Sequence, residues 1–160
     1  MLRFIHAADF HLDSAFAALT PRQAAARRRE SRELPRRLAN YADQNGIDLV
    51  LLAGDLFDSA AAYRDTAEGL SAALGQMNTQ VYIAPGNHDW YGPGSPYLTV
   101  KWPENVHIFT QPPLETMEWP EKNLVLHGAA FTHGEQADGF LTGFTAPADG
   151  KVHKGLLHGE

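Results

Sequence analysis

The sequence contains no cysteine, which excludes disulfide bonds, thiolate zinc sites and a thiol nucleophile. It has no apolar stretch long enough to cross a membrane, and its first residues lack the apolar segment and small-residue cleavage site of a signal peptide. A surplus of positive charge is also missing, because the formal net charge is -6. We therefore expect a cytoplasmic protein that does not coat nucleic acid by bulk electrostatic attraction.

The apolar content is sufficient for one hydrophobic core. Hydrophobic residues make up 44% of the 160 positions, and a chain of this length buries roughly 68–70% of the surface that its unfolded form exposes. No internal repeat or low-complexity tract divides the sequence. We expect a single domain that comprises residues 1–160.

An alternation of strand and helix patterns in the first half predicts the fold class. Apolar runs at residues 2–7, 49–53 and 81–84 are typical of buried strands. Between them, one helix should begin with Thr20 as its N-cap and end near residue 45, and a second helix fits residues 66–78. Pro35 should kink or split the first helix. This order of elements predicts an α/β fold with a parallel sheet and right-handed crossovers.

The character of the chain changes beyond residue 92. Prolines separate short β-rich runs, of which residues 105–110 and 124–131 have the pattern of antiparallel or edge strands. Residues 132–150 are expected to form a long surface loop.

A short polar segment follows each of the three apolar runs of the first half. These segments are Asp9-Phe10-His11, Gly54-Asp55 and Gly86-Asn87-His88-Asp89. Because open α/β sheets bind their ligands at the carboxyl ends of parallel strands, the polar side chains should gather at one edge of the sheet. Carboxylate, imidazole and carboxamide groups without sulfur favour manganese, iron or zinc over calcium, with manganese as the first choice.

The residue types and their spacing predict a pair of divalent metal ions. Asp9 and His11 are one residue apart and can face the same ion. Asp55 can bridge two ions, because a carboxylate has two oxygens, and Asn87 can offer its carbonyl oxygen to the second ion. Two ions about 3.5–4 Å apart can hold the oxygens of an in-line phosphoryl displacement.

The residues after Asn87 are candidates for catalysis and substrate binding. His88 is suited to donate a proton to the leaving oxygen, and Asp89 could fix its tautomer or raise its basicity. Trp90 and Tyr91 either stack on a nucleic-acid base or pack in the core.

The three polar segments, in this order after three strands, resemble the motifs of the calcineurin-like metallophosphoesterase superfamily. Residues 4–14 and 51–58 are most similar to bacterial DNA repair exonucleases of the SbcD type and its YhaO-like branch. The resemblance implies a layered β-sheet sandwich flanked by helices and a DNA exonuclease with a dinuclear metal centre. It further implies a first metal on Asp9, His11 and Asp55, a second on Asp55, Asn87 and a later histidine, and His88 as the catalytic histidine.

Two histidines fit the later ligand that the resemblance requires, because each ends an apolar run and precedes a glycine. They are His127 and His158. We favour His158, since the strand that bears His127 takes the place of an earlier, non-ligating strand of the family. The final Gly-His-x-His motif of the family is absent, so we expect a chain truncated before that motif, with weakened metal binding and low or no activity.

The resemblance also implies partners, namely DNA, a second copy of the chain and a coiled-coil ATPase. A hydrolase of a small phosphoester or cyclic nucleotide, and an inactive interaction module, remain alternatives. Seven of the thirteen basic residues lie between residues 22 and 37, either as a solvated helix face or as a patch for phosphate backbones. Within this cluster, alanine substitution of Arg28, Arg29 and Arg32 should reduce DNA affinity if the patch binds DNA.

Overall fold

Four parallel strands form the first sheet of the computed structural model, which describes residues 1–136 and 139–159. They pair in the order β1 (Phe4–Ala7), β2 (Leu49–Leu52), β3 (Gln80–Ile83) and β4 (Val106–Ile108). Helix α1 (Pro21–Gln44) connects β1 to β2, and helix α2 (Arg64–Gly75) connects β2 to β3. The predicted parallel α/β arrangement is confirmed. β4 is an edge strand as expected, and its pairing with β3 is parallel rather than antiparallel.

A second sheet contains β5 (Glu115–Trp119), β6 (Leu124–Gly128) and β7 (Val152–Leu156), with β6 in the centre. β5 runs antiparallel to β6, and β7 runs parallel to it. Two short helices complete the described elements, α3 (Pro96–Thr99) and the 3-10 helix η1 (Pro120–Lys122). The described part of residues 132–150 contains no helix or strand, in agreement with the predicted surface loop.

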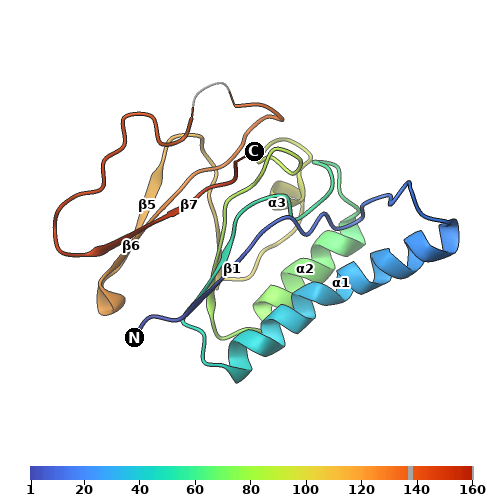
Figure 1. Cartoon of the computed structure of the whole chain (residues 1–160), viewed down its shortest axis with the longest axis horizontal. Helices are drawn as coiled ribbons and strands as arrows, with labels where there is room; N and C mark the ends of the chain where they lie inside the picture. Colours follow the sequence, from blue (N-terminus) through green and yellow to red (C-terminus); the bar gives the residue numbers. More distant parts are fainter. Residues whose placement is uncertain (137–138, 160) are drawn as a thin grey trace.

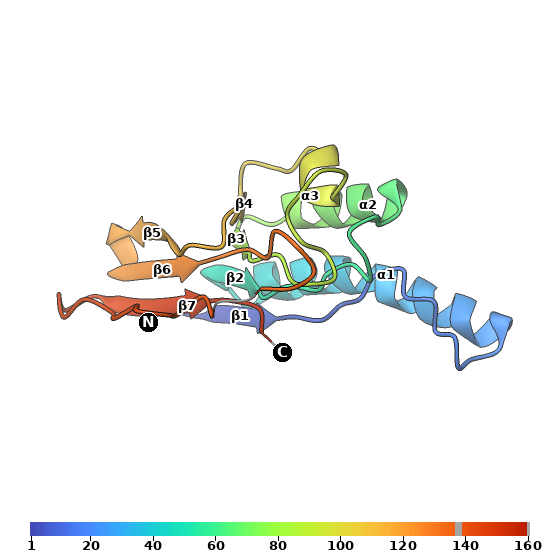
Figure 2. The same cartoon turned by 90° about the horizontal axis from the view of Figure 1, so that it is seen from above.

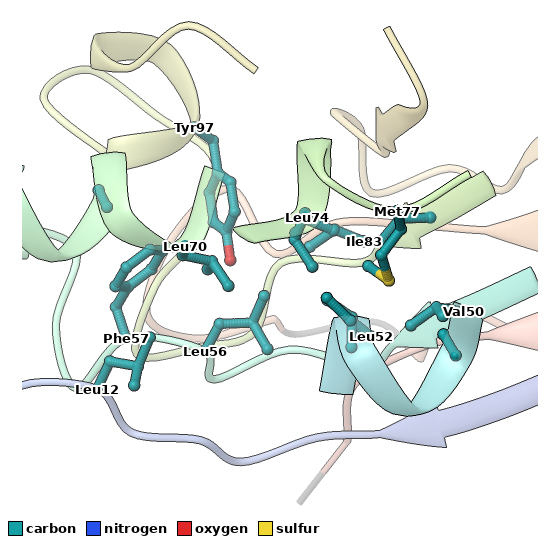
Figure 3. Packing of buried hydrophobic residues seen from close by; sticks show 14 residues of the cluster. Leu12, Val50, Leu52, Leu56, Phe57, Leu70, Leu74, Met77, Ile83 and Tyr97 are labelled. Atoms are coloured by element: carbon teal, nitrogen blue, oxygen red, sulfur yellow. The ribbon is translucent and has the colours of Figure 1, made fainter. Parts of the chain in front are cut away.

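Three layers bury two apolar clusters. Helices α1 and α2 cover one side of the first sheet, and the second sheet lies on the other side (Figure 1). Alternate residues of β2 point to opposite layers: Val50 and Leu52 join the cluster under the helices, shown in Figure 3, and Leu49 and Leu51 join the cluster that reaches the second sheet. All four residues of β2 are buried, as expected of a strand covered on both faces.

β1 differs from its prediction as a buried strand. It stands at the end of the strand order, and its residues are alternately exposed and half-buried. In the view of Figure 2, β1 lies beside β7 of the second sheet. The apolar pattern of residues 2–7 therefore marks a strand, but its position at the edge leaves side chains such as Phe4 open to solvent.

Helix α1 is continuous, so the predicted split at Pro35 is wrong. The helix begins as expected, because the Thr20 hydroxyl accepts a hydrogen bond from the Gln23 backbone N–H and the Gln23 side chain accepts one from the Thr20 backbone N–H. Pro35 is buried within the helix. Proline removes one backbone hydrogen bond, and burial of the Pro35 ring offsets part of that loss, so the helix continues through it. No helix among the described residues has the length and apolar character needed to span a membrane.

Candidate metal centre

The first three strands end level with one another, which brings the polar segments together. Ala7 pairs with Leu52, and Leu52 pairs with Ile83. Beyond the sheet, backbone hydrogen bonds continue between the first two loops, from Asp9 N to Gly54 O at 3.1 Å and from His11 N to Asp55 O at 2.9 Å. The predicted ligands on these loops are therefore fixed by main-chain contacts.

Three of the predicted ligand residues have a left-handed backbone. The φ angle is 57° at Asp9, 42° at His11 and 52° at Asp55. Residues other than glycine rarely adopt this conformation, because the Cβ atom crowds the backbone. Such conformations persist where the surrounding structure enforces them, and they cluster at functional sites. Here they aim the side chains of both loops at one small volume.

The side-chain atoms of the five predicted ligands lie close together. His11 Nε2 is 4.0 Å from Asp9 Oδ1 and 3.8 Å from Asp55 Oδ2. His158 Nε2 is 3.4 Å from Asp55 Oδ2 and 3.0 Å from Asn87 Oδ1. Asp55 thus lies near His11 in one group of ligands and near His158 in the other, as a bridging ligand must. Both Asp55 and His158 are buried.

Hydrogen bonds at Nδ1 set both imidazoles for metal binding. His158 Nδ1 is 2.8 Å from the carbonyl oxygen of Ala53, and His11 Nδ1 is 3.2 Å from Asp58 Oδ1. Each partner is an acceptor, so Nδ1 is the donor in these contacts, and a neutral ring would present the lone pair of Nε2. Histidine ligands of metal sites are oriented in the same way.

The fit to a cation is clearest around His158. With a neutral imidazole, Nε2 would be an acceptor that lies 3.0 Å from Asn87 Oδ1 and 3.4 Å from Asp55 Oδ2, two further acceptors. Acceptors repel one another unless a proton or a cation lies between them. The donor set therefore fits a divalent ion of the manganese, iron or zinc type.

Asp55 divides its two oxygens between different tasks. Oδ1 accepts a hydrogen bond from the His88 backbone N–H at 3.0 Å, which leaves Oδ2 to face the two histidines. This arrangement needs glycine at position 86, since a Cβ there would overlap Asp55 Oδ1. Oδ2 is the atom that the geometry offers for bridging two ions.

The His88 side chain is exposed at the rim of this centre. Its Nδ1 lies 3.2 Å from the carbonyl oxygen of Asp58, and its ring stands edge-on to that of His11 at 5.1 Å between centroids. A nitrogen of His88 lies within 4.8 Å of ligand atoms of both His11 and Asp55. With Nδ1 protonated, Nε2 is the atom available to a substrate.

The structure places Asp89 away from the role expected for it. Its fully buried carboxylate accepts hydrogen bonds from the backbone N–H groups of Gly86 and of residues 55–57 and from the Tyr97 hydroxyl. Burial raises the pKa of Asp89, an effect that these donors oppose. The expectation that Asp89 orients His88 is wrong. Because the hydrogen-bond donors to Asp89 among the described residues belong to these two loops and to Tyr97, Asp89 joins the loop after β2 to the loop after β3.

The aromatic residues after Asp89 differ from each other in their surroundings. Tyr91 packs against both apolar clusters, which fits its core alternative and leaves the base-stacking alternative without support. Trp90 is half-buried, and its indole lies so close to Gly92 and Gly134 that an added Cβ would be 3.2 Å and 3.6 Å from it.

Arg28 and Arg32 are engaged by the loop after β1. Arg32 Nη2 is 2.6 Å from Oδ1 of Asp13, whose side chain is nearly buried, and Arg28 donates to the carbonyl oxygen of Ala15 at 3.2 Å. Arg29 is exposed on α1. Arg32 therefore has a structural task, and the predicted phosphate contact falls mainly to Arg29.

His127 lies in a different environment from His158. On β6, it contacts Thr116 and His153, with its Nε2 2.9 Å from His153 Nδ1. The geometry thus favours His158 over His127 as the later ligand.

The sequence argument missed Asp58, whose carboxylate orients His11 and whose carbonyl oxygen faces His88. Its position three residues after the predicted ligand Asp55 could have indicated that it lies at the same site.

Gly54→Ala should weaken metal binding without unfolding the chain. Gly54 has a φ of 79°, and a Cβ at this position would lie 2.6 Å from the His158 ring. We expect the ring to be displaced and the stability to fall by about 1–2 kcal/mol, since a left-handed alanine is strained. Calorimetric titration with Mn²⁺ and thermal denaturation measure the two effects. The matched control is Gly94→Ala, at an equally left-handed glycine with open space around its Cβ. Equal Mn²⁺ affinity in the two variants would contradict this account.

Comparisons with known proteins agree with the geometry. Residues 2–158 match the family model described as Calcineurin-like phosphoesterase. The chain is 34% identical over 167 aligned positions to a Bacillus subtilis protein named "Uncharacterized metallophosphoesterase YhaO". The alignment covers 99% of this chain and 40% of that relative, so the chain spans about 40% of the length of the curated relative it matches.

Proposed function

We propose a DNA phosphodiesterase activity for this chain, which belongs to the calcineurin-like phosphoesterase family, a family of metal-dependent phosphoesterases. The observation that carries the proposal is the convergence of two carboxylates, two imidazoles and a carboxamide on one volume, with Asp55 common to both halves. The similarity of residues 4–14 and 51–58 to SbcD-type exonucleases supports DNA as the substrate and DNA repair as the context.

The ligand set would hold two divalent ions, with Mn²⁺ as our choice. Asp9 and His11 would bind the first ion, Asn87 and His158 the second, and Asp55 both. Bound there, the ions would polarise a water molecule and neutralise charge on the phosphate oxygens. Asp58 keeps the His11 ring in place, and the Ala53 carbonyl oxygen does the same for His158.

His88 would protonate the leaving oxygen. Its Nδ1 proton is held by the Asp58 carbonyl oxygen, so a second proton on Nε2 points toward the substrate side. Because the Asp58 backbone N–H is bonded to the Leu12 carbonyl oxygen at 3.0 Å, the acceptor for His88 sits on a rigid loop.

A metal titration and two activity assays test this proposal. Calorimetry with Mn²⁺ is expected to show two bound ions of the weakened affinity that the sequence implies. The loaded protein should hydrolyse bis-p-nitrophenyl phosphate and degrade linear DNA at a correspondingly low rate. Hydrolysis of the small ester without degradation of single- or double-stranded DNA would favour the small-phosphoester alternative. Failure of the chain to bind ions at millimolar Mn²⁺ would favour the third alternative, an inactive interaction module.

His88→Ala should reduce turnover of bis-p-nitrophenyl phosphate by a factor of about 100 to 10,000, the usual contribution of a general acid. Mn²⁺ binding should persist, because none of the five ligands changes. Steady-state kinetics and calorimetry on the same sample separate the two effects. His133→Ala, at an exposed histidine of the loop after β6, is the matched control. Loss of both ions in His88→Ala would mean that His88 is a ligand.

Arg29→Ala should weaken DNA binding and flatten its salt dependence. Each phosphate contact that is lost reduces the slope of log K against log salt concentration by about 0.9 for duplex DNA. Lys101→Ala is the control, at an exposed basic residue outside the cluster on α1. Fluorescence anisotropy over a salt series gives the slopes, and a slope in Arg29→Ala equal to that of the wild type would contradict a phosphate contact of Arg29. Arg32 is unsuitable for this test because it pairs with Asp13.

A further inference from the structure

A cavity of about 380 Å³ opens directly beside two of the candidate metal ligands, Asn87 and His158. Apart from Gly159, which follows His158, its other described walls come from the loop after β6, including Phe131, Gln136 and Phe140. A substrate whose phosphate lies on the metal ligands would therefore have its neighbouring group at this cavity. The three polar motifs after β1, β2 and β3 do not explain the function of this cavity.

The apolar wall of the cavity consists of two phenylalanines. The Phe131 and Phe140 rings meet edge to face at 5.1 Å, and Phe131 also stands edge-on to the His158 ring at 5.9 Å. Phe131 is buried and Phe140 is half-buried, so Phe140 offers the accessible ring surface. The apolar wall thus extends from His158, a candidate metal ligand, through the buried Phe131 to the more accessible Phe140.

The backbone around Phe131 is anchored to the loop that carries Asn87 and His88. Phe131 N donates to the Pro85 carbonyl oxygen at 3.1 Å, and Tyr91 N donates to the Phe131 carbonyl oxygen at 2.7 Å. The part of the cavity wall at Phe131 and the loop that carries Asn87 and His88 are therefore held in a fixed relation. Fixed placement of this kind is what a subsite next to a reacting phosphate requires.

We propose that this cavity binds the unpaired base of the nucleotide whose phosphate is at the metal ligands, an inference that rests on the proposed function. Its volume lies within the usual range of small-molecule sites, roughly 300–1,000 Å³. Base stacking on an aromatic ring tolerates any base. Gln136 and Glu135 line the cavity as well, and amide and carboxylate groups pair with the polar edges of bases.

The proposal specifies the form of the DNA substrate. A base inside a duplex is stacked on both faces and paired along its edge, so it cannot enter a cavity without leaving the helix. A single strand or a frayed end offers its base without that cost. We therefore expect preferential binding of single-stranded ends, with Phe140 as the residue that determines this preference.

The experiment compares two probes with the wild-type chain in the presence of Mn²⁺. By calorimetry, dAMP should bind about tenfold or more tightly than 2-deoxyribose 5-phosphate, which carries the same phosphate and sugar without a base. Stacking contributes roughly 1–3 kcal/mol per base, and 1.4 kcal/mol corresponds to a factor of ten. Equal affinities for the two probes would overturn the proposal.

Phe140→Ala locates the effect in the cavity. In this variant the ratio of the two dissociation constants should fall toward one. Phe144→Ala is the control: Phe144 lies in the same loop as Phe140, but its ring packs on His127, so this variant should keep the wild-type ratio. An unchanged ratio in Phe140→Ala, with a melting temperature like that of the wild type, would also overturn the proposal. Because binding is measured without turnover, a chain that hydrolyses no phosphoester would refute the proposed function and leave this comparison readable.

Discussion

Asp55→Asn is expected to abolish the dinuclear centre and to reduce phosphoesterase activity at least about a thousandfold. Asp55 Oδ2 lies 3.8 Å from His11 Nε2 and 3.4 Å from His158 Nε2, so both candidate ion positions depend on this one oxygen. Asparagine keeps the size and can still accept the hydrogen bond from the His88 backbone, but it removes the negative charge. A loss of several kcal/mol of charge stabilisation corresponds to this factor.

Two measurements separate loss of the site from loss of the fold. Calorimetry should detect neither of the two ions with wild-type affinity, and Mn²⁺ should no longer raise the melting temperature, because a ligand stabilises only the state that binds it. The metal-free melting temperature should stay at or above that of the wild type, since a buried charge near Asp9 is gone. Asp65→Asn, at an exposed carboxylate at the start of α2, is the matched control. Two tightly bound ions in Asp55→Asn would rule out the bridging role.

The first half of the fold could be predicted because local pattern and tertiary environment agree there. Leu49 to Leu52 form a continuous apolar run and lie between two layers, and Thr20 caps α1 as its sequence indicates. Pro35 and β1 could not be predicted as well. The continuity of α1 depends on packing that only the tertiary structure supplies, and the exposure of β1 depends on its place in the strand order.

The ligand candidates followed from the sequence for a simple physical reason. Parallel strands that end level with one another must place the residues after them at one edge, so Asp9, Asp55 and Asn87 were brought together by topology alone. The second layer of contacts could not be derived in this way. Whether a carboxylate faces an imidazole or a backbone amide depends on loop conformation, which is why Asp58 was missed and Asp89 was given the wrong partner.

Asp89→Asn should destabilise the chain by about 3–5 kcal/mol. Oδ1 of Asp89 accepts from two backbone N–H groups, and Oδ2 accepts from two more and from the Tyr97 hydroxyl at 2.5 Å. The amide nitrogen of asparagine is a donor, so in either orientation it would face backbone donors in a site without solvent. Unsatisfied buried groups cost roughly 1–3 kcal/mol each, which gives this range for the variant.

Tyr97→Phe is the graded control, because it removes one donor and leaves the four backbone bonds to Asp89 in place. Its cost should be about 1–2 kcal/mol, the penalty for a single buried hydrogen bond. Urea unfolding of the metal-free chain measures both variants on one scale. If Asp89 serves the catalytic chemistry instead, Asp89→Asn will keep the wild-type unfolding midpoint and lose turnover. If it joins the two ligand loops, the unfolding midpoint will fall and Mn²⁺ affinity will fall with it, since Asp55 and Asn87 lie on the loops that it connects.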